Sequence, residues 1–181
     1  HSEGQGWGML FAQANDDAAT FESLWRWTRK NLARKDSRLF AWRYDSRVVP
    51  AVNDLNNASD GDVLIAWALF KAATRWGNSN YAAASAAIRR DIHQLLIRQF
   101  AGYTVLLPGL NGFHSDSYVD INLSYWVIPA FNDFAALEPD QHWQALVRDG
   151  QKLLALSRFG ETRLPTDWIR LDQNASVAPT P

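Results

Sequence analysis

The sequence predicts an all-α fold. Apolar residues recur with helical spacing along most of the 181 residues, and residues that cap helices precede several of these stretches. No sustained alternation of apolar and polar residues indicates a strand, apart from one short extended piece at residues 103–107. A chain of this length that is 47% hydrophobic can bury a core of its own.

Three helices are predicted in the first half of the chain. The first includes residues 6–12, and its glycines indicate close packing against a neighbouring element. A second begins after residues 15–17, a cluster of cap-forming side chains that precedes an amphipathic stripe. The third starts at a capping-box pair, Ser59 and Asp62, and ends at Gly77.

Three more helices are predicted after Gly77. Asn80 is expected to cap the first of them, and the next covers about residues 120–136, where Pro129 should kink or split it. The last begins at Pro139, a residue favoured in the first turn. Long polar connections remain at residues 35–58, 101–119 and 157–181, and the C-terminal stretch 175–181 has the composition of a linker.

Composition excludes several classes of function. The 18 Lys and Arg residues are offset by 19 Asp and Glu residues, so we expect no nucleic-acid partner. There is no cysteine, and the four histidines lack metal-ligand spacing, so we expect no metal and no other cofactor. No apolar run approaches the roughly 18 residues of a membrane span.

Two acidic residues stand where a carboxylate could do chemistry. Glu3 lies among small residues at the start of the first predicted helix, although it could equally be an N-terminal carboxylate that favours the helix dipole. Asp60 lies in a polar stretch, residues 56–62, which could cap a helix, bind a cation or present a carboxylate to a ligand. For Asp62, capping is the favoured role.

Nine tryptophans are the unusual feature of the composition. Trp25, Trp67 and Trp143 lie on amphipathic stripes and are predicted to be core residues. Trp42 and Trp168 lie in connections, where packing does not require them. For these two we favour stacking against a flat ligand face, such as a sugar ring.

Several segments together resemble glycoside hydrolase family 8, and most closely the endoglucanases of bacterial cellulose operons. Residues 2–9 (SEGQGWGM) resemble the family segment that holds the catalytic acid. Residues 58–69 (ASDGDVLIAWAL) are similar to the family signature, which continues with a departure at Phe70, where relatives have a smaller aliphatic residue. Weaker matches follow at residues 122–125 (NLSY), where relatives read Asn-Pro-Ser-Tyr, and at residues 166–168 (TDW).

The resemblance implies an (α/α)6 barrel, of which this chain is expected to hold only the N-terminal part. Residues 1–181 would then form a catalytic domain that is incomplete at both ends. The implied activity is that of an inverting endo-β-1,4-glucanase, with Glu3 as general acid and Asp60 as the carboxylate that grips the sugar at the cleavage subsite. Four residues are expected to bind substrate: Trp42 as a stacking platform, Tyr125 close to the attacking water, Asn57, and Trp168.

The general base of the family is not found in this chain. In relatives it follows a Tyr-Asp pair in the second half of the barrel, and nothing after Trp168 resembles that segment. The pair Tyr44-Asp45 is in the wrong place. Twelve helices of about 12 residues with their connections need on the order of 200 residues, so we expect a second segment or chain to complete the core.

Alternatives to this interpretation remain. The protein could be a glucan-binding or assembly subunit without catalysis, or a family member that acts on xylan or chitosan. The resemblance further implies an association with bacterial cellulose synthesis, with β-1,4-glucan chains and the cellulose synthase machinery as partners. An enzyme that acts on extracellular glucan is exported, so a periplasmic or secreted location is expected.

Overall fold

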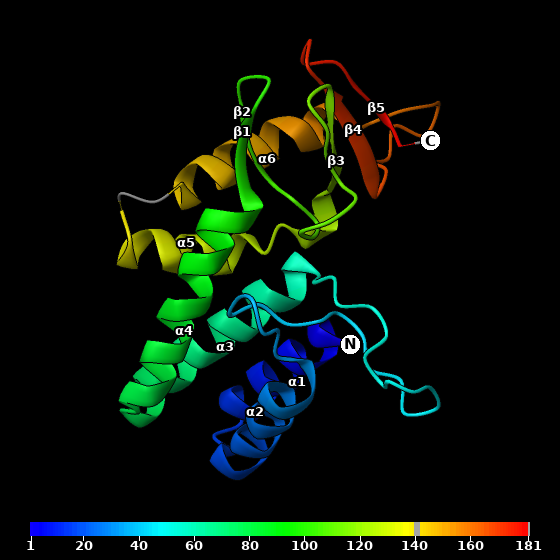
Figure 1. The fold of residues 1–181 in the computed structure, drawn as a ribbon. Coiled ribbons are helices and arrows are strands. Elements are labelled where there is room, and N and C mark those ends of the chain that lie inside the picture. The colour runs from blue at the N-terminus through cyan, green and yellow to red at the C-terminus, as the bar shows by residue number, and fades with distance from the viewer. Residues whose placement is uncertain (140–141, 181) are drawn as a thin grey trace. The chain divides into compact units, whose positions relative to one another are not determined.

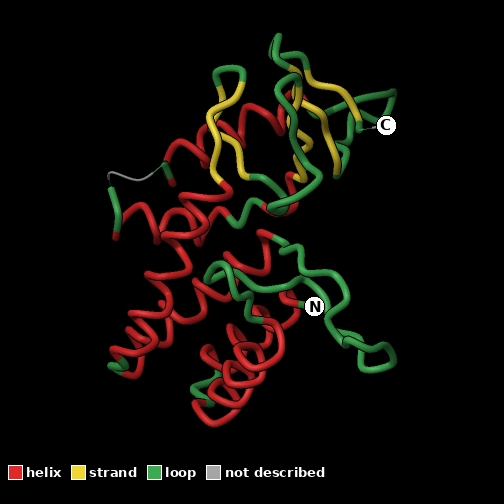
Figure 2. The backbone as a smooth tube through the Cα atoms, viewed as in Figure 1, coloured by secondary structure: helices red, strands yellow, loops and turns green. Residues whose placement is uncertain are grey.

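The computed structural model describes residues 1–139 and 142–180. The chain divides into two compact units, the first from His1 to Gln94 and the second from Leu95 onward. The first unit is helical, whereas the second combines helices with short antiparallel strands (Figures 1 and 2). No helix within the described ranges is both long and apolar enough to cross a membrane.

The helices of the first unit are α1 (Ser2–Ala14), α2 (Ala18–Leu32), α3 (Ser59–Trp76) and α4 (Ser79–Asp91). Helix α1 packs against both α2 and α3, and α3 also packs against α4. The predicted close packing of glycines is confirmed, because a side chain at Gly6 would meet Leu64 of α3 and one at Gly8 would meet Leu24 of α2. Buried residues occupy nearly every position in the first half of α3, which makes it the central helix of this unit.

Most helix boundaries in the first unit follow the local signals. The Asp17 side chain caps α2 by accepting a hydrogen bond from the Thr20 backbone N–H, at 2.9 Å. Gly77 ends α3 in a left-handed conformation, with φ of 63°, as predicted. The cap of α4 is Asn78 and not Asn80, because the Asn78 side chain accepts hydrogen bonds from the first backbone N–H groups of the helix.

The predicted capping box at the start of α3 is wrong. Ala58 occupies the N-cap position, without a side-chain hydrogen bond, and Ser59 is already inside the helix. The Asp62 carboxylate accepts hydrogen bonds from residues outside the helix instead, from the Phe40 backbone N–H and the Asn57 side chain. The Asp62 side chain, which local spacing assigned to a helix cap, therefore makes tertiary contacts instead.

The second unit follows a π-helical turn, η1 (Ile92–Leu96), which continues from α4. Its strands are β1 (Ile97–Phe100), β2 (Tyr103–Leu106), β3 (Tyr118–Asn122), β4 (Trp168–Asp172) and β5 (Val177–Pro179). Its helices are the 3-10 turn η2 (Leu123–Tyr125), α5 (Ile128–Leu137) and α6 (Trp143–Leu156). Strands β1 and β2 form a hairpin, and β3, β4 and β5 form an antiparallel sheet in that order.

The core of the second unit is aromatic. Phe131 and Phe134 of α5 lie against Trp143 of α6, with ring centroids 5.9 and 5.1 Å apart. Gly150 of α6 leaves room for the Trp126 indole, whose N–H donates to the Leu146 carbonyl at 2.9 Å. These contacts join α5, α6 and the segment between η2 and α5 into one apolar cluster.

The all-α prediction is therefore right for the first unit and wrong for the second. The predicted helix over residues 120–136 is instead the end of β3, then η2, then α5. Pro129 causes no kink because it lies in the first turn of α5, where no N–H is needed. The last helix begins at Trp143, not at Pro139, and residues 177–179 of the predicted linker pair with β4 as a strand.

Candidate active site

Glu3 and Asp60 stand at the N-termini of two helices that abut each other. Glu3 lies in the first turn of α1, and Asp60 in the first turn of α3. Between them Gly61 has no side chain, and a Cβ there would meet the Ser2 hydroxyl and lie 2.8 Å from the Glu3 backbone nitrogen. Such an approach of two main chains is possible only at glycine.

The two carboxyl groups differ in their surroundings. Asp60 is only 8% exposed, and its Oδ1 accepts a hydrogen bond from the Gly61 N–H at 2.7 Å. Burial, with the negative charge of Glu3 as a further cause, raises the pKa of Asp60 to about 6. The Glu3 side chain is exposed, and the indole N–H of Trp7 points to its Oε1 at 3.4 Å. Both carboxyl groups therefore lie where α1 and α3 begin, close enough for the charge of Glu3 to act on Asp60.

Two loop segments, residues 40–42 and 56–57, are fastened beside these helix ends. The Ser2 N–H donates to the Trp42 carbonyl at 3.0 Å, and the Trp42 N–H donates to the Asn56 carbonyl at 2.9 Å. The Asp62 carboxylate accepts from the Phe40 N–H at 2.9 Å and from the Asn57 amide at 2.7 Å. One buried side chain thus holds both segments.

Asp62 is fully buried, and this burial raises its pKa to about 8, with the charge of Asp60 contributing in the same direction. Sequence reasoning missed this fastening role. The signal was present in the short spacing of Asn57 and Asp62, but the third partner, Phe40, is 22 residues away. That contact exists only after folding.

Trp42 lines an open cavity of about 450 Å³, together with His1 and residues 43–47. Its indole N–H donates to the Asp54 carboxylate at 2.7 Å, and its ring centroid lies 5.3 Å from that of His1. The ring is half-buried, so its packing is fixed while part of it faces the cavity. Such a held ring can stack against a planar or sugar-like ligand face.

The remaining predicted substrate residues, Tyr125 and Trp168, are neighbours within the second unit. The Trp168 ring stacks on Phe113, with centroids 5.8 Å apart and an interplanar angle of 16°, and Tyr125 meets Trp168 edge-on at 6.1 Å. Strand β4 begins at Trp168, opposite Asn122 of β3, and η2 ends at Tyr125. Phe113, which the sequence analysis did not predict as a substrate-binding residue, is therefore part of this ring cluster.

The structure therefore assembles the predicted residues in two groups. Glu3, Asp60, Trp42 and Asn57 come together in the first unit, and Tyr125 and Trp168 come together in the second. Among the predicted core tryptophans, Trp25 and Trp143 are buried as expected. Trp67 is only half-buried, with the Lys71 ammonium 5.6 Å from its ring centroid. Within residues 1–139 and 142–180, no group of three or more acidic or histidine side chains could hold a metal ion.

Known proteins share this sequence and fold. An endoglucanase of Cellulomonas uda is 41% identical over 179 residues, which cover 99% of this chain and 50% of that protein. The structure of endoglucanase Cel10 from Klebsiella pneumoniae, a family 8 glycosyl hydrolase, is 42% identical with a TM-score of 0.94 and covers 99% of this chain and 58% of its own. The endo-β-1,4-glucanase CMCax from Acetobacter xylinum is 40% identical with a TM-score of 0.95, over 100% of this chain and 57% of its own.

The chain spans about half the length of the curated relatives that it matches. The match to the family nonetheless covers almost the whole chain. Residues 1–180 match the sequence model of the family described as "Glycosyl hydrolases family 8". The segments around Glu3 and Asp60 that resemble the family thus lie in a chain that matches it almost from end to end. This chain belongs to glycosyl hydrolase family 8.

Proposed function

We propose that the protein is an endo-β-1,4-glucanase that hydrolyses β-1,4-glucan with inversion. The observation that carries this proposal is the meeting of Glu3 and Asp60 at abutting helix N-termini, in a chain of family 8. Relatives that are 40–42% identical and carry the name endoglucanase or endo-β-1,4-glucanase support the choice of substrate.

In this proposal Glu3 is the general acid that protonates the leaving glycosidic oxygen. Its exposed carboxyl is accessible to a bound chain, as a proton donor must be. Asp60 grips the sugar at the cleavage subsite, and its raised pKa reflects the burial that a closed subsite imposes. Trp42 and Asn57 are proposed as substrate-binding residues of the first unit, and Tyr125 and Trp168, independently, as substrate-binding residues of the second.

Inversion also needs an ionised carboxylate that activates water on the opposite face of the sugar, about 6.5–9.5 Å from the acid. We place this general base in the half of the family's length that this chain does not match. The complete fold in this proposal is the (α/α)6 barrel. Two large side chains of α1, Trp7 and Phe11, are 41% and 64% exposed, which supports further helices packing there.

A second candidate is a glucan-binding or assembly subunit without catalysis. The ring cluster of Phe113, Tyr125 and Trp168 and the held ring of Trp42 favour it, because stacking surfaces bind sugars without any base. Action on xylan or chitosan is the alternative within the enzyme class. The endoglucanase proposal includes two further points. The protein is associated with bacterial cellulose synthesis and its synthase machinery, and its location is periplasmic or secreted.

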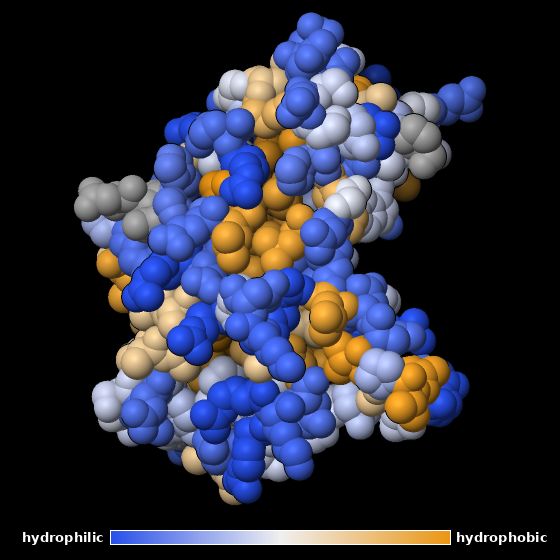
Figure 3. Space-filling model, viewed as in Figure 1, coloured by the Kyte–Doolittle hydropathy of each residue, from blue (hydrophilic) through white to orange (hydrophobic). Residues whose placement is uncertain are grey.

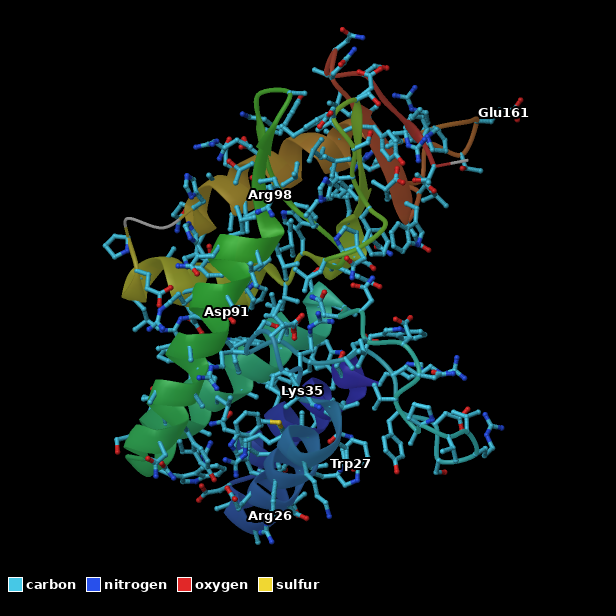
Figure 4. The ribbon with its side chains drawn as sticks, in the orientation of Figure 1. Arg26, Trp27, Lys35, Asp91, Arg98 and Glu161 are labelled. Atoms are coloured by element: carbon cyan, nitrogen blue, oxygen red, sulfur yellow. The ribbon has the colours of Figure 1, made fainter. Side chains whose placement is uncertain are left out.

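The test is release of reducing ends from carboxymethylcellulose by the protein with the base-bearing half of the family's length present, as the wild type and as Glu3→Gln. Loss of the general acid is expected to lower turnover by about 10²–10⁴-fold, while binding of cello-oligosaccharides persists. Glu161→Gln is the matched control, because Glu161 is exposed in the loop between α6 and β4 (Figure 4) and should keep full activity. Undiminished turnover in Glu3→Gln would remove Glu3 from the mechanism, and wild-type binding without new chain ends would favour the non-catalytic candidate.

A further inference from the structure

Another cavity of the first unit, of about 600 Å³, is lined by none of the predicted catalytic or substrate-binding residues, although Phe40 beside the candidate active site is part of its wall. It is bounded by α2, α4 and residues 33–40, and in Figure 3 strongly hydrophilic side chains cover the surface between α2 and α4. In Figure 4, Lys35 just after α2 and Asp91 at the end of α4 mark this region. The volume falls in the range of roughly 300–1,000 Å³ that is typical of small-molecule sites.

Arginine dominates the charge of this cavity. Among the described residues that line it are Arg29, Arg34, Arg38 and Arg90, against a single carboxylate, Glu22. The whole chain has a formal net charge of −1, so this excess of positive charge is a local feature and not a property of the protein's surface in general. Clustered guanidinium groups create a positive potential that attracts and orients oxyanions.

Arg34 forms the buried part of this arrangement. Its side chain is only 9% exposed, and its Nε and Nη2 donate to the two oxygens of Asp36, at 3.0 and 2.8 Å. Its Nη1 is buried and has no hydrogen-bond acceptor within the described part of the chain. A buried N–H without an acceptor is costly, and an oxygen from a bound anion would remove that cost.

The acidic groups around the cavity are already engaged. The Glu22 carboxylate accepts from the Tyr81 hydroxyl at 2.7 Å, and Asp91 accepts from the Arg38 backbone N–H at 2.6 Å. Asp36 is paired with Arg34. Within the described residues, the guanidinium groups of Arg38 and Arg90 lie on the exposed rim and form no ion pair, so they are available to a ligand.

The floor of the cavity is apolar and rigid. Trp25 and Phe40 are 5% and 3% exposed and meet edge-on at 5.9 Å, and Tyr81 is 9% exposed. The Arg29 guanidinium lies over the Trp25 ring, 5.1 Å from its centroid, which fixes one of the cations in place. A ring-bearing ligand could therefore rest on this floor while its anionic group meets the arginines.

We propose that this cavity is a binding site for a small oxyanionic ligand, a phosphate- or carboxylate-bearing molecule with a compact ring. The rim guanidiniums of Arg38 and Arg90 bind the anionic group, the buried Nη1 of Arg34 donates a further hydrogen bond to it, and the aromatic floor contacts the ring. The site does not depend on the proposed glucanase activity, because it shares no residue with Glu3, Asp60, Trp42 or Asn57.

The experiment is isothermal titration calorimetry of the protein with inorganic phosphate, glucuronate and, as the neutral counterpart, glucose. Saturable binding of one or both anions and none of glucose is expected. Tighter binding of phosphate identifies phosphoryl ligands, and tighter binding of glucuronate identifies carboxylate ligands. Absence of saturable binding by both anions, or equal binding of glucose, overturns the proposal.

The double variant Arg38→Gln/Arg90→Gln is expected to raise the Kd for the anion at least tenfold. Both side chains are exposed, so the fold should persist, which far-UV circular dichroism and thermal unfolding would verify. Arg26→Gln is the matched control, since Arg26 is an exposed arginine of the same helix, α2, that does not line the cavity (Figure 4). An unchanged Kd in the double variant, or an equal loss in Arg26→Gln, would contradict a built site.

Discussion

Asp60 and Asp62 of the first unit and Asp149 of the second are all buried, yet their surroundings act on the carboxyl groups in opposite directions. Burial raises the pKa of Asp60 to about 6 and that of Asp62 to about 8. Burial would raise the pKa of Asp149 as well, but hydrogen bonds from Arg148 and from the Thr104 N–H outweigh it and hold that pKa well below its usual range.

The difference separates a carboxylate whose charge is stabilised by neighbouring cations from two whose charge is disfavoured by burial. Asp149 fastens α6 to the β1–β2 hairpin through Thr104, and the cations beside it stabilise its charge. Asp60 has no such cation and faces the like charge of Glu3, an arrangement that reduces stability. Carboxyl groups held at such a cost cluster at functional sites, which supports the proposed role of Asp60 in binding substrate.

Among the changes to the buried carboxyl groups, the largest effect is expected from Asp60→Asn. If Asp60 grips the sugar at the cleavage subsite, removing its charge should lower kcat/KM on carboxymethylcellulose by about 10²-fold or more. Asp149→Asn is the corresponding change in the second unit and should leave kcat/KM within about twofold, because its contacts are structural. Equal losses of kcat/KM in both variants would contradict the assignment of a substrate-binding role to Asp60 and a structural role to Asp149.

Stability should depend on pH in the direction set by the raised pKa values. A buried carboxyl with a raised pKa stabilises the fold fully below its unfolded pKa of about 3.9, and that stability is lost as pH rises through the folded value. The free energy of unfolding of the wild type should therefore fall relative to Asp60→Asn as pH rises from 4 to 6. For Asp62→Asn the relative decline should continue to about pH 8. Urea unfolding across this range is the measurement, and a difference that does not vary with pH would refute the assignment.

Gly61→Ala should destabilise the first unit by about 1–3 kcal/mol, because the added Cβ meets the backbone of α1 at Glu3. Activity should fall with it, since the two carboxyl groups would be forced apart. Gly4→Ala is the matched control in α1, where a Cβ meets nothing within 4 Å and the helix should gain up to about 1 kcal/mol. Thermal unfolding compares the two, and a Gly61→Ala protein as stable as Gly4→Ala would show that the contact is not tight.

The smallest effect is expected from Asp149→Asn on stability. The amide retains an acceptor for the Thr104 N–H but loses the charge that pairs with Arg148 and Lys152, both of them exposed. A loss of about 1 kcal/mol at pH 7 should follow. It should begin to diminish only as pH falls below the unfolded pKa of about 3.9, because the native carboxylate, whose pKa is held well below its usual range, stays charged at lower pH. A loss that persists undiminished at pH 3 would contradict an electrostatic origin.

The same division between units explains how much could be predicted from the sequence. Helices of the first unit carry local signals, such as Asp17 at the start of α2 and Gly77 at the end of α3, and these were read correctly. The strands of the second unit depend on partners far along the chain. Strand β3 pairs with β4 some 50 residues later, as Asp120 and Arg170 show by lying opposite each other.

Some of the missed signal was nonetheless local. Residues 168–172 alternate between half-buried and buried positions, a period-two pattern that the Trp-Ile-Arg-Leu-Asp sequence already displays. For the candidate site, the segments around Glu3 and Asp60 could be found from their motifs. The fastening of the loop by Asp62 could not, because its partner Phe40 is recognisable only once α3 and the loop have been brought together.

The close contact at Gly61 limits where substrate specificity can change in such a protein. Because Gly61 lies directly against Ser2 and the Glu3 backbone nitrogen, the junction of α1 and α3 is fixed by close packing at these two helix ends. Under the proposed function, exchanges in the loop that presents Trp42 can alter which polysaccharide is accommodated while Glu3 stays in place. Substitutions that adapt such a protein to a new substrate are accordingly expected in residues 40–57, and not at the junction of α1 and α3.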